Sequence, residues 1–248
     1  MRSLRVDCIP QISEALSQDL AGKTVIVIDA LRATSNIVTA LSNGAVSVWP
    51  VETVAQAKQA AGANDLLAGE RQCKKIPGFD LGNSPLEFTE QTVSGQRIVM
   101  TTTNGTRGIQ KAAKAAAVLA GSMLNARACA ETALQWKRDI VLLCAGTKDV
   151  FALEDGLCAG LIAKEIRELR VGDLQFSDFT RAMEGAYDSF ADRLEDVFST
   201  SDSGIRLGRL GYGGDVSFCA QRNTTDTVPI LTNGEMRAFS PRQIFSYK

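Results

Sequence analysis

Short apolar runs alternate with segments of helical periodicity from about residue 24 to residue 170. The apolar runs predict buried strands over Thr24–Ile28, Val46–Val51, Leu66–Ala68, Ile98–Thr101, Ala117–Ala120 and Ile140–Cys144. The intervening segments predict helices over Thr34–Leu41, Val54–Ala61, Arg107–Ala115, Ala126–Trp136 and Asp155–Leu169. Continuous apolar strands separated by helices are typical of parallel sheets that are covered on both faces. The pattern therefore predicts an α/β fold with a mainly parallel sheet and helices on both faces.

The pattern changes after residue 172. Apolar residues recur at helical spacing from Phe179 to Val197, which predicts one long amphipathic helix. Residues 203–214 are rich in glycine and predict a loop, while Val216–Ala220 and Val228–Leu231 predict short extended segments. We therefore divide the chain into an α/β domain, residues 1–172, that carries most of the site motifs, and a C-terminal segment, residues 173–248, that packs on or extends it.

Composition narrows the class of protein. The net charge of the 248-residue chain is -1, so no general basic field is present to attract nucleic acid. No apolar run is long enough to cross a bilayer, and the N-terminus has no signal-peptide core, so we expect a cytoplasmic protein with no membrane partner. The six cysteines form no C-x-x-C pair, which predicts buried reduced thiols.

The chain contains no histidine. This absence excludes phosphohistidine chemistry, histidine-based triads and histidine zinc sites. Acid–base or metal chemistry must therefore use carboxylates, hydroxyls, lysine, cysteine or tyrosine. A metal site made of carboxylates favours a hard cation, and Mg²⁺ is the first candidate.

Polar residues follow most of the predicted strands. Ligands of open α/β sheets bind outside the carboxyl ends of the strands, so we expect these residues to form the site. Asp29 follows the buried run TVIVI directly, where a carboxylate is costly to bury unless it is paired or bound to a metal. The acidic candidates for metal ligands are Asp29, Glu70, Glu154 and Asp155. Asp29, Glu70 and Asp155 are also candidates for catalysis.

The segment Thr101–Gly108, TTTNGTRG, suits an anion. It offers hydroxyls, backbone amides and the N-terminus of a helix, all of which bind phosphate well. The alternative interpretation is a tight turn capped by threonine, with Gly105 at positive φ. The segment is not a Walker A loop, because no G-x-x-x-x-G-K-[ST] pattern occurs.

Three arginines, Arg32, Arg71 and Arg107, lie near the same strand ends. They are candidates to bind phosphate or a second anionic group of a substrate, or else to pair with carboxylates of the site. Cys144 is not a cysteine-phosphatase nucleophile, because Val150 stands where the C-x5-R pattern requires arginine. A haloacid-dehalogenase site is disfavoured, because Leu31 replaces the second aspartate of D-x-D.

Five segments follow one another in order across about residues 24–170: DALRATSNIVTAL (29–41), AGERQCKKIPGFDLGNSPLEF (68–88), IVMTTTNGTRGI (98–109), LAGSMLNA (119–126) and LCAGTKDVFALEDGLCAG (143–160). Together they resemble the 2-phosphosulfolactate phosphatase family. Residues 214–231 resemble the same family more loosely. The glycine often expected after Glu-Arg is absent, and Gln72-Cys73 stand there instead.

The resemblance implies a Mg²⁺-dependent hydrolase that acts on 2-phospho-3-sulfolactate or related 2-phospho-hydroxy acids, which in some organisms serves coenzyme M biosynthesis. It also implies a fold distinct from the common phosphatase folds. The site residues that it implies are Asp29, Arg32, Glu70, Asn83, Ser84, Thr102, Thr103, Asn104, Gly105, Thr106, Ser122, Asn125, Glu154 and Asp155.

We expect Asp29 and one or two of the other three carboxylates to hold Mg²⁺, and residues 101–106 to bind the phosphoryl group. An arginine would bind the carboxylate or sulfonate of a small anionic substrate. The nucleophile is either Asp29 or a water molecule. Two alternatives are a haloacid-dehalogenase-like phosphatase or phosphotransferase, and a non-catalytic module that binds an anion or a nucleotide. We expect a homodimer.

Overall fold

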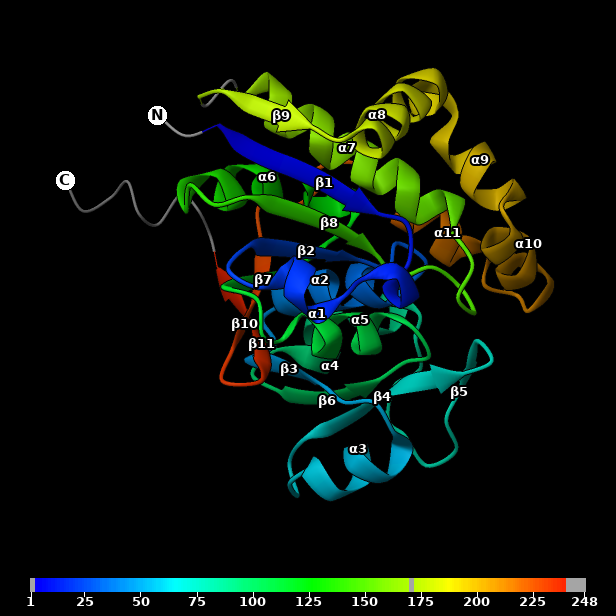
Figure 1. The fold of residues 1–248 in the computed structure, drawn as a ribbon. Coiled ribbons are helices and arrows are strands. Elements are labelled where there is room, and N and C mark those ends of the chain that lie inside the picture. The colour runs from blue at the N-terminus through cyan, green and yellow to red at the C-terminus, as the bar shows by residue number, and fades with distance from the viewer. Residues whose placement is uncertain (1–2, 170–171, 240–248) are drawn as a thin grey trace.

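The computed structural model describes residues 3–169 and 172–239, which form one mixed sheet with helices packed against it (Figure 1). The strands are β1 (Leu4–Ile9), β2 (Thr24–Ile28), β3 (Ser47–Pro50), β4 (Leu66–Arg71), β5 (Lys74–Lys75), β6 (Arg97–Thr101), β7 (Ala117–Gly121), β8 (Ile140–Cys144), β9 (Leu174–Phe176), β10 (Val228–Thr232) and β11 (Glu235–Phe239). The α-helices are α1 (Ser17–Leu20), α2 (Ala33–Ser42), α3 (Val54–Ala60), α4 (Glu90–Val93), α5 (Gly105–Ala112), α6 (Ala126–Gln135), α7 (Leu153–Glu168), α8 (Asp178–Phe190), α9 (Leu194–Thr200), α10 (Asp202–Arg209) and α11 (Gly213–Cys219). Short 3-10 helices are η1 (Ile12–Glu14), η2 (Pro85–Glu87), η3 (Met123–Asn125) and η4 (Ala191–Arg193).

The strand order among the described residues is β5-β4-β6-β3-β11-β10-β7-β2-β8-β1-β9. The pairs β4–β6, β6–β3, β7–β2, β2–β8, β8–β1 and β1–β9 are parallel. The hairpin β10–β11 is antiparallel to its neighbours β7 and β3, and β5 is antiparallel to β4. The sheet is therefore mainly parallel, as the sequence predicted.

Helices cover both faces of the sheet because neighbouring residues of each central strand point in opposite directions. Ile26 and Ile28 of β2 belong to a core that includes residues of α6, α7 and α9. Val25 and Val27 belong to the opposite core, together with residues of α2 and α5. A smaller cluster packs α3 against β6. This arrangement confirms the prediction that both faces are covered.

The C-terminal segment differs from its predicted secondary structure. The single helix expected across Phe179–Val197 is wrong, since α8 ends at Phe190 and η4 separates it from α9. The glycine-rich loop expected over residues 203–214 is also wrong, because most of this stretch forms α10. Gly204 is not a turn residue there: a Cβ at this position would lie 1.8 Å from the carbonyl oxygen of Phe198, so the glycine permits close packing of α10 on α9.

The strand predicted over Val216–Ala220 is wrong as well, because these residues lie in α11 and its C-terminal cap. The extended segment Val228–Leu231 is confirmed as β10. The strands β1, β5, β9 and β11 were not predicted from the sequence. The described cysteines are free and, apart from half-buried Cys73, buried, which agrees with the predicted reduced thiols. No helix in the described part of the chain is both long and apolar enough to cross a membrane.

The packing of α7 on α8 gives a test of the fold. A Cβ added to Gly160 of α7 would lie 2.1 Å from the Met183 carbonyl oxygen, so Gly160→Ala must force the two helices apart. We expect a loss of roughly 2–3 kcal/mol of unfolding free energy, measured by urea denaturation. Gly185→Ala on α8 is the control: no atom lies within 4 Å of its added Cβ, and we expect a gain of roughly 0.5 kcal/mol. Equal effects of the two changes would contradict the close packing.

Candidate active site

Asp29 leaves the carboxyl end of β2 and precedes α2. Its Oδ1 accepts a hydrogen bond of 3.2 Å from the Ala33 amide, and its backbone carbonyl accepts one from the Thr34 amide. The residue is only 6% exposed. The turn after β2 therefore buries a carboxylate at the edge of the sheet, as the position of Asp29 in the sequence suggested.

Asp155 joins the loops that follow two neighbouring strands. Its side chain lies in the first turn of α7, and its Oδ1 accepts a hydrogen bond of 2.8 Å from the Ala30 amide. Its Oδ2 accepts one of 3.0 Å from the Gly146 amide, in the loop after β8. Glu154, the preceding residue, is also buried. The carboxylate of Asp155 therefore fixes the loops after β2 and β8 relative to each other.

Glu70, near the carboxyl end of β4, organises two other loops. The amide and hydroxyl of Thr103 donate to its Oε1 at 2.7 and 2.6 Å, and the Cys73 amide donates to its Oε2 at 2.7 Å. Glu70 itself is buried. These bonds bring the loop after β6 against the loop after β4.

Gly105, at the end of the loop after β6, brings this loop into contact with Asp29. A Cβ at Gly105 would lie 2.5 Å from the Cβ of Ala33 and 2.8 Å from the Oδ2 of Asp29. The alternative expectation of a positive φ at Gly105 is wrong, since this glycine begins α5 with its helical neighbours. Glycine is required here because the start of α5 passes directly over the carboxylate.

Burial and neighbouring negative charge raise the pKa values of Asp29 and Asp155. Burial is the main cause that raises the pKa of Asp29 to about 6, and the negative charges of Glu70 and Glu154 add to it, while amides of Ala33 and Gly105 oppose it. Burial, followed by the charges of Asp29 and Glu154, raises the pKa of Asp155 well above its ordinary value. The charges of Glu70 and Glu154 therefore act on Asp29, and those of Asp29 and Glu154 act on Asp155.

Positive charge does not neutralise these carboxylates directly. Among the described residues, no lysine or arginine forms an ion pair with Asp29, Glu70, Glu154 or Asp155. Within the same part of the chain, no three acidic or thiol side chains converge closely enough to form a metal centre by themselves. Any cation at this edge must therefore take further ligands from water or from a substrate.

Arg32 is paired with a carboxylate from the C-terminal segment. Its Nη1 donates to the Oδ2 of Asp215 at 2.5 Å, and both side chains are 2% exposed. The Ser84 hydroxyl donates to the other Asp215 oxygen at 2.6 Å, and the Tyr212 ring lies 4.5 Å from the guanidinium carbon. Arg32 also donates to the Cys73 carbonyl at 3.3 Å. Of the two possibilities for Arg32, the structure shows pairing with a carboxylate.

The other predicted cations differ in their surroundings. Arg71 donates to the carbonyls of Glu70 and Glu52 and to the Thr101 hydroxyl. Arg107 is exposed in the first turn of α5 and, among the described residues, forms no ion pair. Arg71 therefore holds the loop after β4, whereas Arg107 is free to meet a ligand.

The segment after β6 satisfies much of its own hydrogen bonding. Thr102 and Thr106 bond each other reciprocally through their hydroxyls and amides, and both are buried. Thr103 is committed to Glu70. The side chain of Asn104, which is half-buried, has no hydrogen-bond partner in the described part of the chain. Asn104, like Arg107, is thus open to a ligand.

Three remaining predicted residues are held by neighbours. Asn83 accepts a hydrogen bond of 2.5 Å from Asn36 of α2, which keeps the Asn83–Ser84 loop near Arg32. Ser122 and Asn125 form a reciprocal cap of η3, and the Asn125 amide group also donates to the carbonyls of Ala120 and Thr227. The structure therefore brings Asn83 and Ser84 to the side of Arg32, while the bonds of Ser122 and Asn125 serve the end of β7 and the approach to β10.

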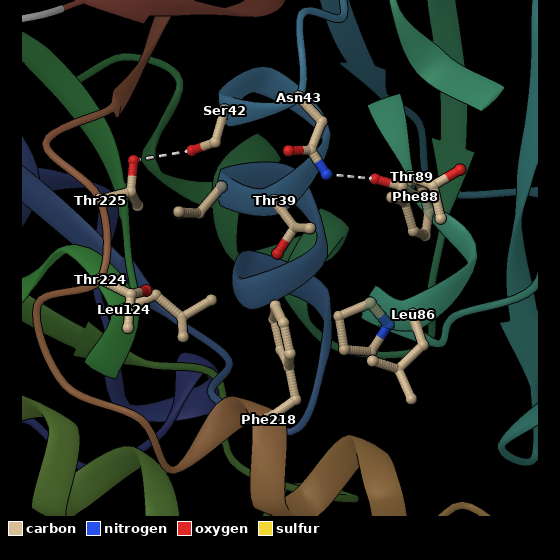
Figure 2. A pocket seen from close by; sticks show the side chains of 12 residues that line it. Thr39, Ser42, Asn43, Leu86, Phe88, Thr89, Leu124, Phe218, Thr224 and Thr225 are labelled. Atoms are coloured by element: carbon tan, nitrogen blue, oxygen red, sulfur yellow. Dashed lines mark hydrogen bonds between the residues drawn. The ribbon is translucent and has the colours of Figure 1, made fainter. Parts of the chain in front are cut away.

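A separate pocket of about 330 Å³ lies along the side of α2 (Figure 2). Thr39, Ser42 and Asn43 of α2 line it, facing Leu86 and Phe218, and hydrogen bonds join Ser42 to Thr225 and Asn43 to the Phe88 carbonyl. None of the predicted site residues lines this pocket. We therefore place the candidate active site at the carboxyl edge of the sheet and not in this pocket.

Sequence reasoning missed Asp215 and Tyr212, which complete the surroundings of Arg32. Both lie in the segment for which the sequence predicted a loop and a strand. The prediction therefore did not include α11, the helix that brings them to Arg32. A signal was present: Asp215 lies in the stretch that resembles the family loosely and is an acidic residue between apolar ones.

Comparison with known proteins identifies the family of this chain. The family model described as 2-phosphosulpholactate phosphatase matches residues 11–234. Proteins named "Probable 2-phosphosulfolactate phosphatase" from Thermotoga petrophila, Caldanaerobacter subterraneus subsp. tengcongensis and Clostridium acetobutylicum are 44%, 42% and 36% identical to this chain. These alignments cover 86%, 89% and 94% of this chain and 90%, 92% and 100% of the relatives.

The α/β fold, the acidic sheet edge and these matches define a phosphoric monoester hydrolase. The chain belongs to the 2-phosphosulfolactate phosphatase family. The family predicted from the sequence segments is thereby confirmed.

The raised pKa of Asp29 predicts a pH dependence of stability. The pKa of about 6 in the folded protein exceeds its ordinary value of 3.8, so the folded state binds a proton that the unfolded state releases. This contribution is complete below the unfolded pKa and is lost as the pH rises through about 6. In EDTA, the Tm of Asp29→Asn relative to wild type should rise by about 4 °C between pH 5 and pH 7.5. The same Tm difference between Asp29→Asn and wild type at both pH values would refute the raised pKa of Asp29. Asp192→Asn, at an exposed position, is the control, and its Tm difference from wild type should not change between these pH values.

The buried pair of Arg32 and Asp215 predicts that removing one partner costs much more unfolding free energy than replacing both with apolar residues. Asp215→Ala leaves a buried guanidinium without its carboxylate and should cost roughly 3 kcal/mol of unfolding free energy. Replacing both partners, as Arg32→Met with Asp215→Leu, should restore much of this loss. Glu184→Ala, which breaks the more exposed pair with Arg167, is the control and should cost below about 1 kcal/mol. Urea denaturation measures all three, and a small effect of Asp215→Ala would argue against the pair.

Proposed function

We propose that this protein hydrolyses 2-phosphosulfolactate, or a closely related 2-phospho-hydroxy acid, with Mg²⁺ as its cofactor. The observation that carries the proposal is the set of buried carboxylates directly after β2, near the end of β4 and at the start of α7, none of which forms an ion pair with a described lysine or arginine. The relatives named for this substrate supply its identity.

The donor set fits Mg²⁺. This ion commonly takes one or two protein carboxylates and completes its shell with water and substrate phosphate, so a closed protein cage is not needed. Asp29 would hold the ion together with one or two of Glu70, Glu154 and Asp155. Bound Mg²⁺ would offset the negative charge of the phosphoryl oxygens beside these carboxylates.

The start of α5 supplies the groups for the phosphoryl oxygens. Asn104 is the N-cap of α5, and Arg107 lies in its first turn. Among the described residues, the Asn104 side chain has no hydrogen-bond partner and Arg107 forms no ion pair. Thr102, Thr103 and Thr106 are already hydrogen-bonded, so their part is to fix the backbone that presents Asn104 and Arg107. This preorganised arrangement would position the phosphoryl group for displacement.

Asp155 fixes the positions of the loops around Asp29. Asp155 ties the loops after β2 and β8 through the amides of Ala30 and Gly146, and so keeps Asp29 in place. Asp29 then acts as the nucleophile or orients an attacking water. Rapid acid quenching of a reaction with ³²P-labelled substrate distinguishes the two, because only direct attack by Asp29 leaves a phosphoenzyme, whose acyl phosphate survives acid and is cleaved by hydroxylamine.

Phosphate release tests the proposal. Wild-type protein should release phosphate from 2-phosphosulfolactate with Mg²⁺, lose this activity in EDTA and regain it when Mg²⁺ is restored. Asp29→Asn should lower kcat/KM roughly 1000-fold or more while leaving the circular dichroism spectrum unchanged. The exposed control Asp192→Asn should keep wild-type activity. Absence of metal-dependent turnover on any 2-phospho-hydroxy acid would refute the proposal.

A further inference from the structure

The turn between β4 and β5, at the lower right of Figure 1, has an unfavourable backbone conformation. Arg71 pairs with Lys74 across this hairpin, so Gln72 and Cys73 form the turn. Their φ angles are 57° and 66°, which glycine and asparagine adopt more readily than other residues. Such a conformation persists only where surrounding contacts hold it. The contacts of Cys73 therefore decide the shape of this turn.

Two hydrogen bonds hold the backbone of Cys73. Its amide donates to the Oε2 of Glu70 at 2.7 Å, and its carbonyl accepts from the Nη2 of Arg32 at 3.3 Å. The other carboxylate oxygen of Glu70 accepts from the amide and hydroxyl of Thr103. Cys73 thus lies between a buried carboxylate and a buried guanidinium. A shift of the guanidinium would move the amide that orients the Oε2 of Glu70.

Arg32 is in turn held by the C-terminal segment. Its Nη1 donates to the Oδ2 of Asp215 at 2.5 Å, and the Ser84 hydroxyl donates to the other oxygen of this carboxylate at 2.6 Å. The Tyr212 ring lies 4.5 Å from the guanidinium carbon. A guanidinium is planar and rigid, so a contact that fixes Nη1 also fixes Nη2. Asp215 therefore sets the position from which Arg32 reaches the carbonyl of Cys73.

Arg32 and Arg71 act on different parts of Glu70. The Nη1 of Arg71 donates to the backbone carbonyl of Glu70 at 2.7 Å. Arg32 reaches the carboxylate only through the backbone of Cys73. Neither arginine forms an ion pair with this carboxylate among the described residues. The carboxylate of Glu70 is therefore oriented without losing its negative charge, which a ligand of a divalent cation needs.

We propose that Asp215 is a positioning residue for the cation site. It holds Arg32, which holds the carbonyl of Cys73, and the amide of Cys73 orients the carboxylate of Glu70 towards the cation. The inference rests on the function proposed above, in which Glu70 is a candidate ligand of Mg²⁺, and it gives the C-terminal segment a part in that site. Removing a group that orients a metal ligand without touching the metal typically lowers metal affinity roughly 10–100-fold.

Binding of Mn²⁺, followed by electron paramagnetic resonance of the free ion, tests this role without turnover. Mn²⁺ prefers the same oxygen ligands and octahedral geometry as Mg²⁺. Asp215→Asn keeps the size of the side chain but removes its charge, and it should weaken Mn²⁺ binding roughly 10-fold or more. Arg32→Lys should do the same, because a single ammonium cannot reproduce the fork that joins Asp215 to Cys73. Circular dichroism checks that each variant is folded, and Arg32→Lys carries the test if Asp215→Asn is not.

Glu165→Gln is the matched control. Glu165 is a buried carboxylate whose Oε2 lies 3.0 Å from the Nη1 of Arg127, so its removal also breaks an ion pair. It lies roughly 15 Å along α7 from Asp155, away from the candidate ligands. We expect Mn²⁺ binding within about twofold of wild type, because distant sites act independently.

A double variant separates positioning of Glu70 from a general weakening of the fold. Glu70→Asp keeps a carboxylate for the ion but is one methylene too short to keep its bond to the Cys73 amide. If Asp215 acts through Glu70, adding Asp215→Asn to Glu70→Asp should weaken Mn²⁺ binding no further. A general effect on the fold would instead multiply the two losses.

Multiplied losses in the double variant, or unchanged Mn²⁺ binding in Asp215→Asn and Arg32→Lys, would overturn the positioning role. If Mn²⁺ binding depends on Asp215 as expected but no 2-phospho-hydroxy acid releases phosphate, the proposed reaction fails while this role stands. If wild-type protein releases phosphate with Mg²⁺ and Mn²⁺ binding ignores Asp215, the role fails while the reaction stands. Wild-type protein that binds no Mn²⁺ would overturn the role as well as the proposed cofactor.

Discussion

Asp29, Glu70 and Asp155 are held at one edge of the sheet by backbone amides and hydroxyls, and not by basic side chains. Amide hydrogen bonds stabilise carboxylates without removing their net charge, so the negative potential persists where the strands end. The surrounding loops are shaped by these bonds: Asp155 ties two of them together, and Glu70 ties two others. The arrangement of these loops follows from this single constraint, and so does the negative potential on which the proposed binding of Mg²⁺ rests.

The central sheet could be predicted because its strands are continuous apolar runs, and such runs give a clear signal in a parallel sheet. The carboxylates could be placed for the same reason, since residues directly after such strands share an edge. The role of Asp155 in joining two loops could not be predicted, because its partners are backbone amides, and that of Ala30 lies 125 residues away in the sequence. No pattern of side chains records such contacts. The assignment of metal ligands stays a prediction.

The C-terminal segment was predicted less well, for a reason visible in its glycines. Gly204 serves close packing of α10 on α9, whereas glycine-rich sequence usually indicates turns. The surroundings of Arg32 were missed as a result, since they depend on Asp215 and Tyr212 from this segment. The hairpin β10–β11 had a signal in Asn233-Gly234, both at positive φ, a pair that favours tight β-turns. Its insertion between β7 and β3 is a property of tertiary packing.

That insertion has a consequence for how the molecule is made. Within the described residues, the strands from β5 to β3 and those from β7 to β9 join only through the C-terminal hairpin. Glu70 and Thr103 belong to one of these halves, and Asp29 and Asp155 to the other. During synthesis, the first two hundred residues leave the ribosome before the strands that close the sheet between them. The sheet therefore closes only once β10 and β11 are available, and a chain that stops before β10 lacks the two strands that join these halves of the sheet.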